Sequence, residues 1–140
     1  FADGEEGYLI KEFERLKKEE QALLGWSAKR ELAKINYRIH TDAIKTNLIP
    51  SELTSQQISV IYASEADVLN VALFGMTAKE WRENHPDKKG NIRDYASINE
   101  LICLSNMENI NAVLIEDGLS QKERLIKLNK IAMAKRCLTQ

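Results

Sequence analysis

The sequence predicts an all-α protein, a single compact domain of about six or seven helices around a buried helix near residues 98–117. Apolar residues recur at spacings of three and four along most of the 140-residue chain, as on one face of a helix. Four Ser/Thr-x-x-Glu/Gln motifs, which cap helix N-termini, each precede an apolar run. No stretch alternates between apolar and polar residues with a period of two, so no strand is expected.

Two apolar stripes, separated by Gly25, predict the first two helices. The first stripe consists of Leu9, Phe13, Leu16 and Leu23, with Glu20 interrupting it. The second consists of Ala28, Leu32, Ile35, Ile39 and Ala43, and Pro50 follows it. Gly25 is expected to end the first helix, because glycine is common just beyond a helix C-terminus. We therefore expect an N-terminal helix over residues 1–24 and a helical C-terminal domain over residues 25–140.

The first helix has two alternative uses for its apolar stripe. The stripe covers only two heptads, which is too short to predict a coiled coil. Pairing with a neighbouring chain and folding back onto its own domain both stay open.

The capping motifs mark where the later helices begin. The motif at residues 54–57 opens a helix that runs to Tyr62, and Ser64 is expected to begin another that ends at Gly75. The other three motifs lie at residues 77–80, 97–100 and 120–123.

The helix that begins after Ser97 is the expected centre of the core. Its side chains are apolar on several faces, which is typical of a buried helix. Leu101 and Leu104 lie in its most apolar part, so both are expected to be buried.

The polar stretch over residues 77–101 is interpreted mainly as a connector. Trp81 is expected to insert into the core from a two-turn helix, and His85 has no Ser, Cys or carboxylate pair beside it in the sequence. Asp, Gly and Asn residues in this stretch favour turns. The alternative is a phosphate-binding loop that uses Lys88, Lys89 and Arg93.

Nothing in the sequence predicts catalysis, a cofactor or a metal site. No P-loop, dinucleotide fingerprint or nucleophile elbow is present, so a non-enzymatic protein is expected, with no catalytic residue. The two cysteines and two histidines lack the spacing of a structural zinc site. Unpaired cysteines and the absence of an apolar run of membrane-spanning length predict a cytoplasmic protein without membrane contact.

Two basic stripes are candidate nucleic-acid-binding surfaces. Residues 25–50 carry five basic and two acidic side chains, and residues 121–140 carry six basic and one acidic. The candidate residues on the second helix are Arg30, Lys34, Arg38 and Lys45, which helical spacing places on one face. Those on the last helix are Lys122, Lys127 and Lys130, with Arg124, Lys135 and Arg136 adding to the charge. Each stripe can follow a phosphate backbone, or it can be an ordinary solvated helix face.

Several phrases resemble a known family. "YLIKEFERLKKEE" at residues 8–20 resembles the last helix of the KilA-N domain, a DNA-binding module of phage and viral proteins. Residues 25–50, 62–112 and 119–133 resemble the region that follows this domain in bacterial KilA-N-containing proteins. The DNA-binding part proper would lie upstream, so no DNA-contacting residue is carried over.

The resemblance implies a phage-related bacterial protein that reaches DNA through its parent chain. The function expected is therefore a non-enzymatic helical part of a KilA-N DNA-binding protein, with auxiliary nucleic-acid contacts. The alternative is a protein-interaction or self-association module without DNA binding, with a protein partner or a second copy of the chain.

Overall fold

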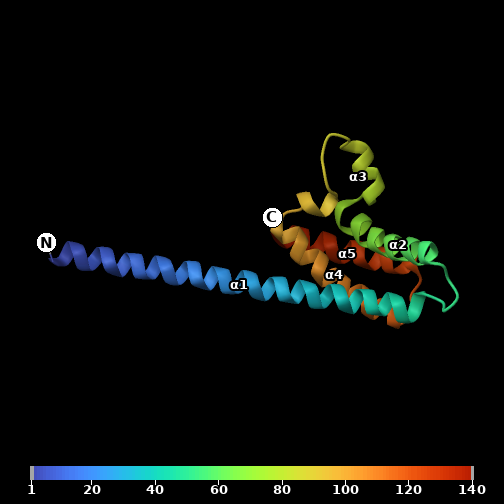
Figure 1. Cartoon of the computed structure of the whole chain (residues 1–140), viewed down its shortest axis with the longest axis horizontal. Helices are drawn as coiled ribbons and strands as arrows, with labels where there is room; N and C mark the ends of the chain where they lie inside the picture. Colours follow the sequence, from blue (N-terminus) through green and yellow to red (C-terminus); the bar gives the residue numbers. More distant parts are fainter. Residues whose placement is uncertain (1, 140) are drawn as a thin grey trace. The chain divides into compact units, whose positions relative to one another are not determined.

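The chain folds into α-helices joined by short connections, as the computed structural model in Figure 1 shows. The structure describes the backbone of residues 2–139 and the side chains of residues 7–134. Five α-helices and one 3₁₀ helix follow in the order α1 (Ala2–Leu48), α2 (Ser55–Phe74), α3 (Ala78–Asn84), η1 (Ile92–Tyr95), α4 (Ile98–Glu116) and α5 (Gln121–Thr139). The all-α class is confirmed, and no strand occurs in the described backbone. The predicted number of helices was slightly too high, because two expected breaks are absent.

The first absent break is at Gly25, where α1 continues from Ala2 to Leu48. Gly75 and Gly118 take a positive φ of 80° where α2 and α4 end, but Gly25 has no positive φ. A glycine inside a helix costs roughly 1 kcal/mol relative to alanine, which weakens the helix without stopping it. The expected helix end at Gly25 is therefore wrong.

The second absent break is at Ser64, which lies inside α2 rather than at its start. Its hydroxyl accepts a hydrogen bond from Nε2 of Gln121 at 2.9 Å, so it serves α5 instead of capping a new helix. Asp67, expected in the first turn of that helix, instead accepts the backbone N–H of Ala78 at 2.9 Å. One carboxylate of α2 thus fixes the start of α3.

The four predicted capping motifs all form reciprocal hydrogen bonds. Thr54, Thr77 and Ser97 each cap a helix with the Gln or Glu three residues later. Ser120 and Glu123 exchange the same pair of bonds at 3.3 Å before α5. Asn91 and Asp94 form a fifth box at the start of η1, which the Ser/Thr-x-x-Glu/Gln pattern does not include.

Backbone contacts divide the chain into two compact units, residues 1–32 and residues 33–140. The first unit consists of the N-terminal part of α1, and no side chain between Gly7 and Leu32 is buried. The second unit contains the protein core.

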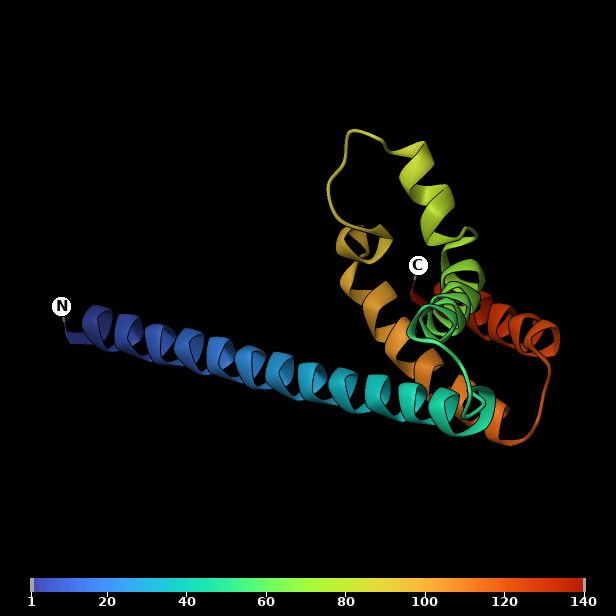
Figure 2. The ribbon, with the colours of Figure 1, turned by 45° about the vertical axis from the view of Figure 1, so that its right-hand side comes forward.

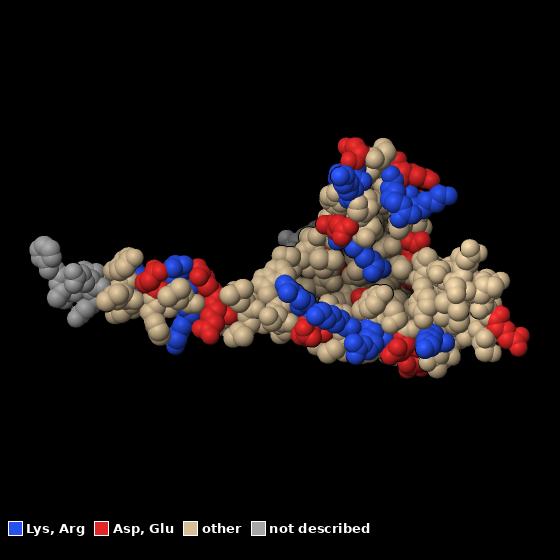
Figure 3. Space-filling model, in the orientation of Figure 1, with Lys and Arg blue, Asp and Glu red and all other residues tan. Residues whose placement is uncertain are grey.

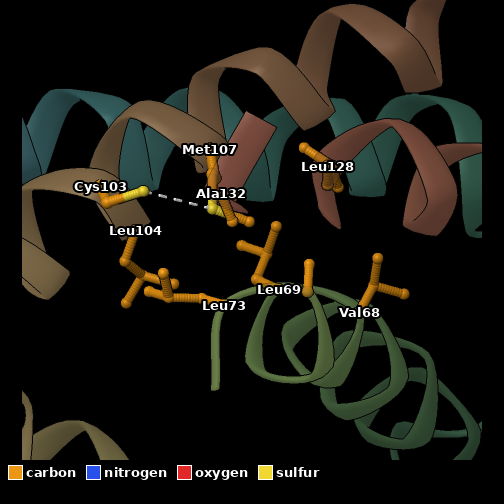
Figure 4. Close-up of a cluster of buried hydrophobic side chains, with 9 residues drawn as sticks. Val68, Leu69, Leu73, Cys103, Leu104, Met107, Leu128 and Ala132 are labelled. Atoms are coloured by element: carbon orange, nitrogen blue, oxygen red, sulfur yellow. Dashed lines mark hydrogen bonds between the residues drawn. The ribbon is translucent and has the colours of Figure 1, made fainter. Parts of the chain in front are cut away.

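The larger core cluster joins α2, α4 and α5. Figure 4 shows side chains from these three helices that point toward one another. The cluster consists of Val68, Leu69, Ala72, Leu73, Cys103, Leu104, Met107, Leu128 and Ala132. The Cys103 thiol contacts the sulfur of Met107 at 3.8 Å, and both side chains are buried.

A smaller cluster attaches the C-terminal end of α1. Ala43 and Ile44 of α1 are buried with Ala112 and Ile115 of α4, and the partly buried Tyr62 of α2 packs against them. Of the apolar face predicted for this part of α1, only Ala43 is buried, while Leu32, Ile35 and Ile39 are exposed. The buried face is instead centred on His40 and Ile44, about a third of a turn away at 100° per residue.

The central position predicted for α4 holds for one of its faces only. Leu104 is 5% exposed, whereas Leu101 is 42% exposed. The prediction that Leu101 is a core residue is therefore wrong. The helix is apolar on several faces, but its neighbours cover just one of them, and that face also holds polar side chains such as Asn111.

The polar stretch between α2 and α4 forms a small excursion from the core. Figure 2 shows α3 leaving the end of α2 and a loop returning through η1 to α4. Trp81 is buried as expected, stacked on His85 at 4.8 Å and against Tyr95 at 5.3 Å. Nδ1 of His85 lies 2.8 Å from the carbonyl oxygen of Trp81. His85 thus packs within the excursion, where its partners are an indole and a backbone carbonyl.

Candidate functional site

The four basic residues predicted on α1 all lie at exposed positions. They are Arg30, Lys34, Arg38 and Lys45. Figure 3 shows basic side chains in a row over the C-terminal half of α1, with acidic side chains beside them. Glu31 and Asp42, on the same stretch of helix, are not buried either. The α1 stripe is therefore accessible but of mixed charge.

The three basic residues predicted on α5 are also exposed, and they have fewer basic neighbours than the sequence suggests. Lys122, Lys127 and Lys130 lie at the surface. Arg124, counted with them in the sequence, is 2% exposed and points into the core. Lys135 and Arg136 lie outside the side chains that the structure describes. The described α5 surface thus carries three lysines and Glu123.

The alternative phosphate-binding loop does not gather its three basic residues for a ligand. Arg93 is half-buried, and its Nε donates to Oδ1 of Asn70 at 3.2 Å. Its Nη2 donates to the carbonyl oxygen of Ala66 at 3.4 Å. Lys88 lies over the ring of Tyr95 at 5.0 Å. Arg93 therefore connects η1 to α2, which supports the connector interpretation.

A buried polar cluster that the sequence did not predict lies among the described residues. Arg124 of α5 forms two hydrogen bonds to Glu65 of α2, from Nη1 at 2.5 Å and from Nη2 at 2.9 Å. Its Nη1 also donates to Oδ1 of Asn111 on α4 at 3.1 Å, and its Nε donates to the carbonyl oxygen of Leu119. Gln121 donates to the same carboxylate at 3.2 Å. The guanidinium thereby joins three helices.

The cluster extends to α1 through Asn111. Because the amide oxygen of Asn111 accepts from Arg124, its Nδ2 faces Nε2 of His40 at 2.8 Å and donates to it. That bond requires an unprotonated Nε2, so the neutral ring carries its proton on Nδ1. Nδ1 lies 4.0 Å from Oε2 of Glu108. Each of four helices therefore contributes at least one polar side chain to a continuous series of contacts.

Burial determines the protonation of this cluster. Burial lowers the pKa of His40 to about 4, and it raises the pKa of Glu108 to about 7, against the opposing effect of Arg93. Burial also disfavours the Glu65 carboxylate, but the hydrogen bonds and charge of Arg124 hold the pKa of Glu65 below its ordinary value. Between about pH 4 and 7, His40 and Glu108 are both neutral, so their contact is no ion pair.

We predict that His40 and Glu108 have opposite effects on how stability depends on pH. Between about pH 4.5 and 6.5, unfolding releases the Glu108 proton and lets His40 bind one, so the two contributions cancel. In Glu108→Gln, only His40 remains, and the free energy of unfolding should rise with pH by up to about 1.4 kcal/mol per unit. In His40→Gln, it should fall with rising pH over the same range.

Urea unfolding at pH 4.5, 5.5 and 6.5 measures these slopes relative to wild type. Thr46→Gln is the control, because it changes an exposed α1 side chain that does not titrate and should keep the wild-type slope. Equal pH slopes in Glu108→Gln and His40→Gln would contradict the assigned protonation.

The buried cluster has the features of a structural site, which holds helices together. All its members are held from within the fold, and among residues 7–134 every buried side-chain nitrogen and oxygen has a hydrogen-bond partner. Within the described residues, no three His, Cys, Asp or Glu side chains gather as a metal site requires. Satisfied buried polar networks of this kind fix how helices align. The sequence offered one usable signal, namely polar residues on otherwise apolar helix faces.

Exposed large hydrophobic side chains are concentrated on α1. Among the described residues, twelve of the nineteen large hydrophobic side chains that are exposed belong to this helix. They are Tyr8, Leu9, Ile10, Phe13, Leu16, Leu23, Leu24, Trp26, Leu32, Ile35, Tyr37 and Ile39. Neither core cluster contains any of them. α1 therefore presents the clearest surface for a partner.

Among the helices of residues 2–139, no single one combines the length and the apolar composition that crossing a bilayer requires. α2 and α3 meet both criteria only as a pair, and they are bent by 62° at the break between them.

No family model, curated protein or solved structure matches the chain.

Proposed function

We propose that this chain is a protein-association module in which one apolar stripe of α1 binds another protein chain. The stripe consists of Leu9, Phe13, Leu16, Leu24, Leu32, Ile35 and Ile39, and it leaves out Tyr37. One observation carries the proposal, the concentration of exposed large hydrophobic side chains on α1. Large exposed apolar patches are uncommon on monomeric soluble proteins and are typical of interaction sites.

The energetics of the N-terminal helix support the same conclusion. An isolated helix is marginal in water, and most helices in proteins are stabilised by the packing of one apolar face. Between Gly7 and Leu32 no side chain is buried, so this stretch lacks such packing within its own unit. Arg15 contacts Glu12 and Glu19, but exposed pairs of this kind add little to the stability of a helix. Burying a leucine or phenylalanine contributes roughly 1.5–3 kcal/mol, so a partner chain would stabilise α1 far more.

Complex size in extracts of cells that make the protein natively tests the proposal. The wild-type chain should elute from a sizing column as a complex larger than 16.0 kDa. Leu16→Glu with Leu32→Glu should shift it to the monomer position. Tyr37→Glu is the matched control, because Tyr37 is exposed on α1 but lies on the opposite side from Ile35 and Ile39. An unchanged size in the double variant would overturn the proposal.

Nucleic-acid contact is the second candidate function. It is supported by the exposure of all seven basic residues that the sequence nominated. Together with the resemblance to KilA-N proteins, this supports a non-enzymatic, cytoplasmic part of a phage-related DNA-binding protein, with DNA reached through the parent chain. The burial of Arg124 and the acidic residues beside the α1 stripe reduce the charge available, so this candidate stands second.

We predict that Lys127→Glu with Lys130→Glu separates these two functions. Both lysines are exposed, and exposed charges contribute little to folding, so stability should change by less than about 1 kcal/mol. If α5 binds phosphates, affinity for duplex DNA should fall for all sequences alike. The slope of log affinity against log salt should flatten by about 0.9 for each lost contact.

A salt titration of wild type beside the double variant measures this effect. Ile126→Gln is the control, since it changes an exposed α5 side chain without changing charge. If wild type does not bind duplex DNA at about 50 mM salt, the nucleic-acid function fails for this chain and the association function is unaffected.

A further inference from the structure

Seven of the twelve exposed large hydrophobic residues of α1 are arranged symmetrically about Leu24. Leu9 and Ile39 lie fifteen residues to either side of it, Phe13 and Ile35 eleven residues, and Leu16 and Leu32 eight residues. All seven side chains are large, apolar and exposed. Glu20 and Ala28 complete the series at four residues to either side. Read from either end, the stripe therefore has the same spacing.

We propose that the stripe is covered by α1 of a second copy of this chain, running antiparallel, with the two-fold axis at Leu24. The proposal rests on the association function proposed above and names its partner. In this register Leu9 faces Ile39 of the second copy, Phe13 faces Ile35, Leu16 faces Leu32, and the two Leu24 side chains meet. A two-fold interface requires self-complementarity of this kind, since each contact must occur twice.

Charge favours the antiparallel direction over the parallel one. Residues 1–24 carry seven acidic and four basic side chains, a net charge of −3. Residues 25–48 carry five basic and two acidic side chains, a net charge of +3. An antiparallel pair places each half beside its opposite, whereas a parallel pair places like charge beside like, and complementary charge of this kind selects the orientation.

Glu20 supports the same orientation. In a parallel, in-register pair two Glu20 carboxylates would meet inside the apolar seam, where an unpaired charge is costly. In the antiparallel register each Glu20 faces Ala28 of the second copy, whose small side chain leaves the carboxylate a route to water.

The spacing also gives the shape of the pair. From Leu9 to Ile39 the stripe advances thirty residues in eight steps, about 3.75 residues per step. A straight helix has about 3.6 residues per turn, so two helices that keep this stripe covered wind around each other in the right-handed sense. At a rise of about 1.5 Å per residue the seam is about 45 Å long.

Sedimentation equilibrium of the purified 140-residue chain tests the identity of the partner. Wild type and Tyr37→Glu should give a dimer, twice the monomer mass of 16.0 kDa. Leu24→Glu should give a monomer, because it places two carboxylates against each other at the two-fold axis. A wild-type chain that stays monomeric at about 100 μM overturns the proposal, since that concentration lies well above a micromolar dissociation constant.

Cysteine cross-linking tests the direction. Phe13→Cys and Ile35→Cys are each made with Cys137→Ser, while the native Cys103 is retained because it is buried. In an antiparallel pair of Phe13→Cys chains the two introduced thiols lie about 33 Å apart, and the same holds for Ile35→Cys. Neither variant alone should therefore cross-link with itself under mild oxidation, because a disulfide needs the two Cα atoms within about 7 Å. An equal mixture of the two variants should form a disulfide-linked dimer. Self-linking of Phe13→Cys alone would show a parallel pair and overturn the proposal.

The outcomes separate this proposal from the proposed function. A stripe-dependent complex in cell extracts, beside a purified chain that is monomeric, rejects the second copy and leaves the association function standing. If the size of the complex in cell extracts is unchanged in Leu16→Glu with Leu32→Glu, the association function itself is rejected. Circular dichroism of every variant confirms that the helices remain.

Discussion

Replacing Arg124 by methionine is expected to lower the free energy of unfolding by about 3–5 kcal/mol, because it leaves a buried carboxylate without its cation. Glu65 is 4% exposed and receives two hydrogen bonds from this guanidinium. Asn111 and the carbonyl oxygen of Leu119 lose a donor at the same time. Urea denaturation at neutral pH measures the loss.

Two further variants test whether loss of the buried ion pair causes the destabilisation in Arg124→Met. Lys127→Met, on the exposed side of the same helix, should change the free energy of unfolding by less than about 0.5 kcal/mol. Glu65→Leu combined with Arg124→Met should recover part of the loss, since replacing a buried ion pair by apolar side chains is often close to neutral. A loss of under about 1 kcal/mol in Arg124→Met would show that the cluster is not a structural centre.

Leu104→Ala is expected to cost about 2–5 kcal/mol, the usual range when a buried leucine is truncated and leaves a cavity. Leu104 is 5% exposed and lies in the cluster between α2, α4 and α5. Leu101→Ala, one turn earlier in α4, should cost less than about 1 kcal/mol, because that side chain is 42% exposed. Thermal or urea unfolding of both variants gives the comparison. Equal losses would mean that Leu101 is covered in solution, as by a second chain.

The beginnings of helices were predictable because their signals are local. A Thr or Ser and the Glu or Gln three residues later can form both bonds of a capping box wherever the helix packs, and all four predicted boxes form. Helix ends at glycine depend on a positive φ, which neighbouring contacts decide. The sequence therefore predicted the helix end at Gly75 correctly and the one at Gly25 wrongly.

Which face of a helix is buried was harder to predict, because periodicity shows which residues share a face and not which face meets the core. The most apolar face of α1 is exposed, and the buried one contains His40. Arg124 appeared in the sequence as one more surface base, since its partner Glu65 lies 59 residues away. Only the three-dimensional fold brings such partners together, so the buried cluster had no local signature beyond polar residues in apolar surroundings.

The ion pair between α2 and α5 has a consequence for how the chain is synthesised. A ribosome that has made α2, α3 and α4 has produced Glu65 and Asn111 but not Arg124. The Arg124 guanidinium donates hydrogen bonds to both of these side chains. Leu128 and Ala132, which complete the apolar cluster, also emerge only with α5. The nascent domain therefore stays open until its last helix is released. During that interval the apolar sides of α2 and α4 are exposed as targets for chaperones, and a translational pause before Gln121 would lengthen the exposure.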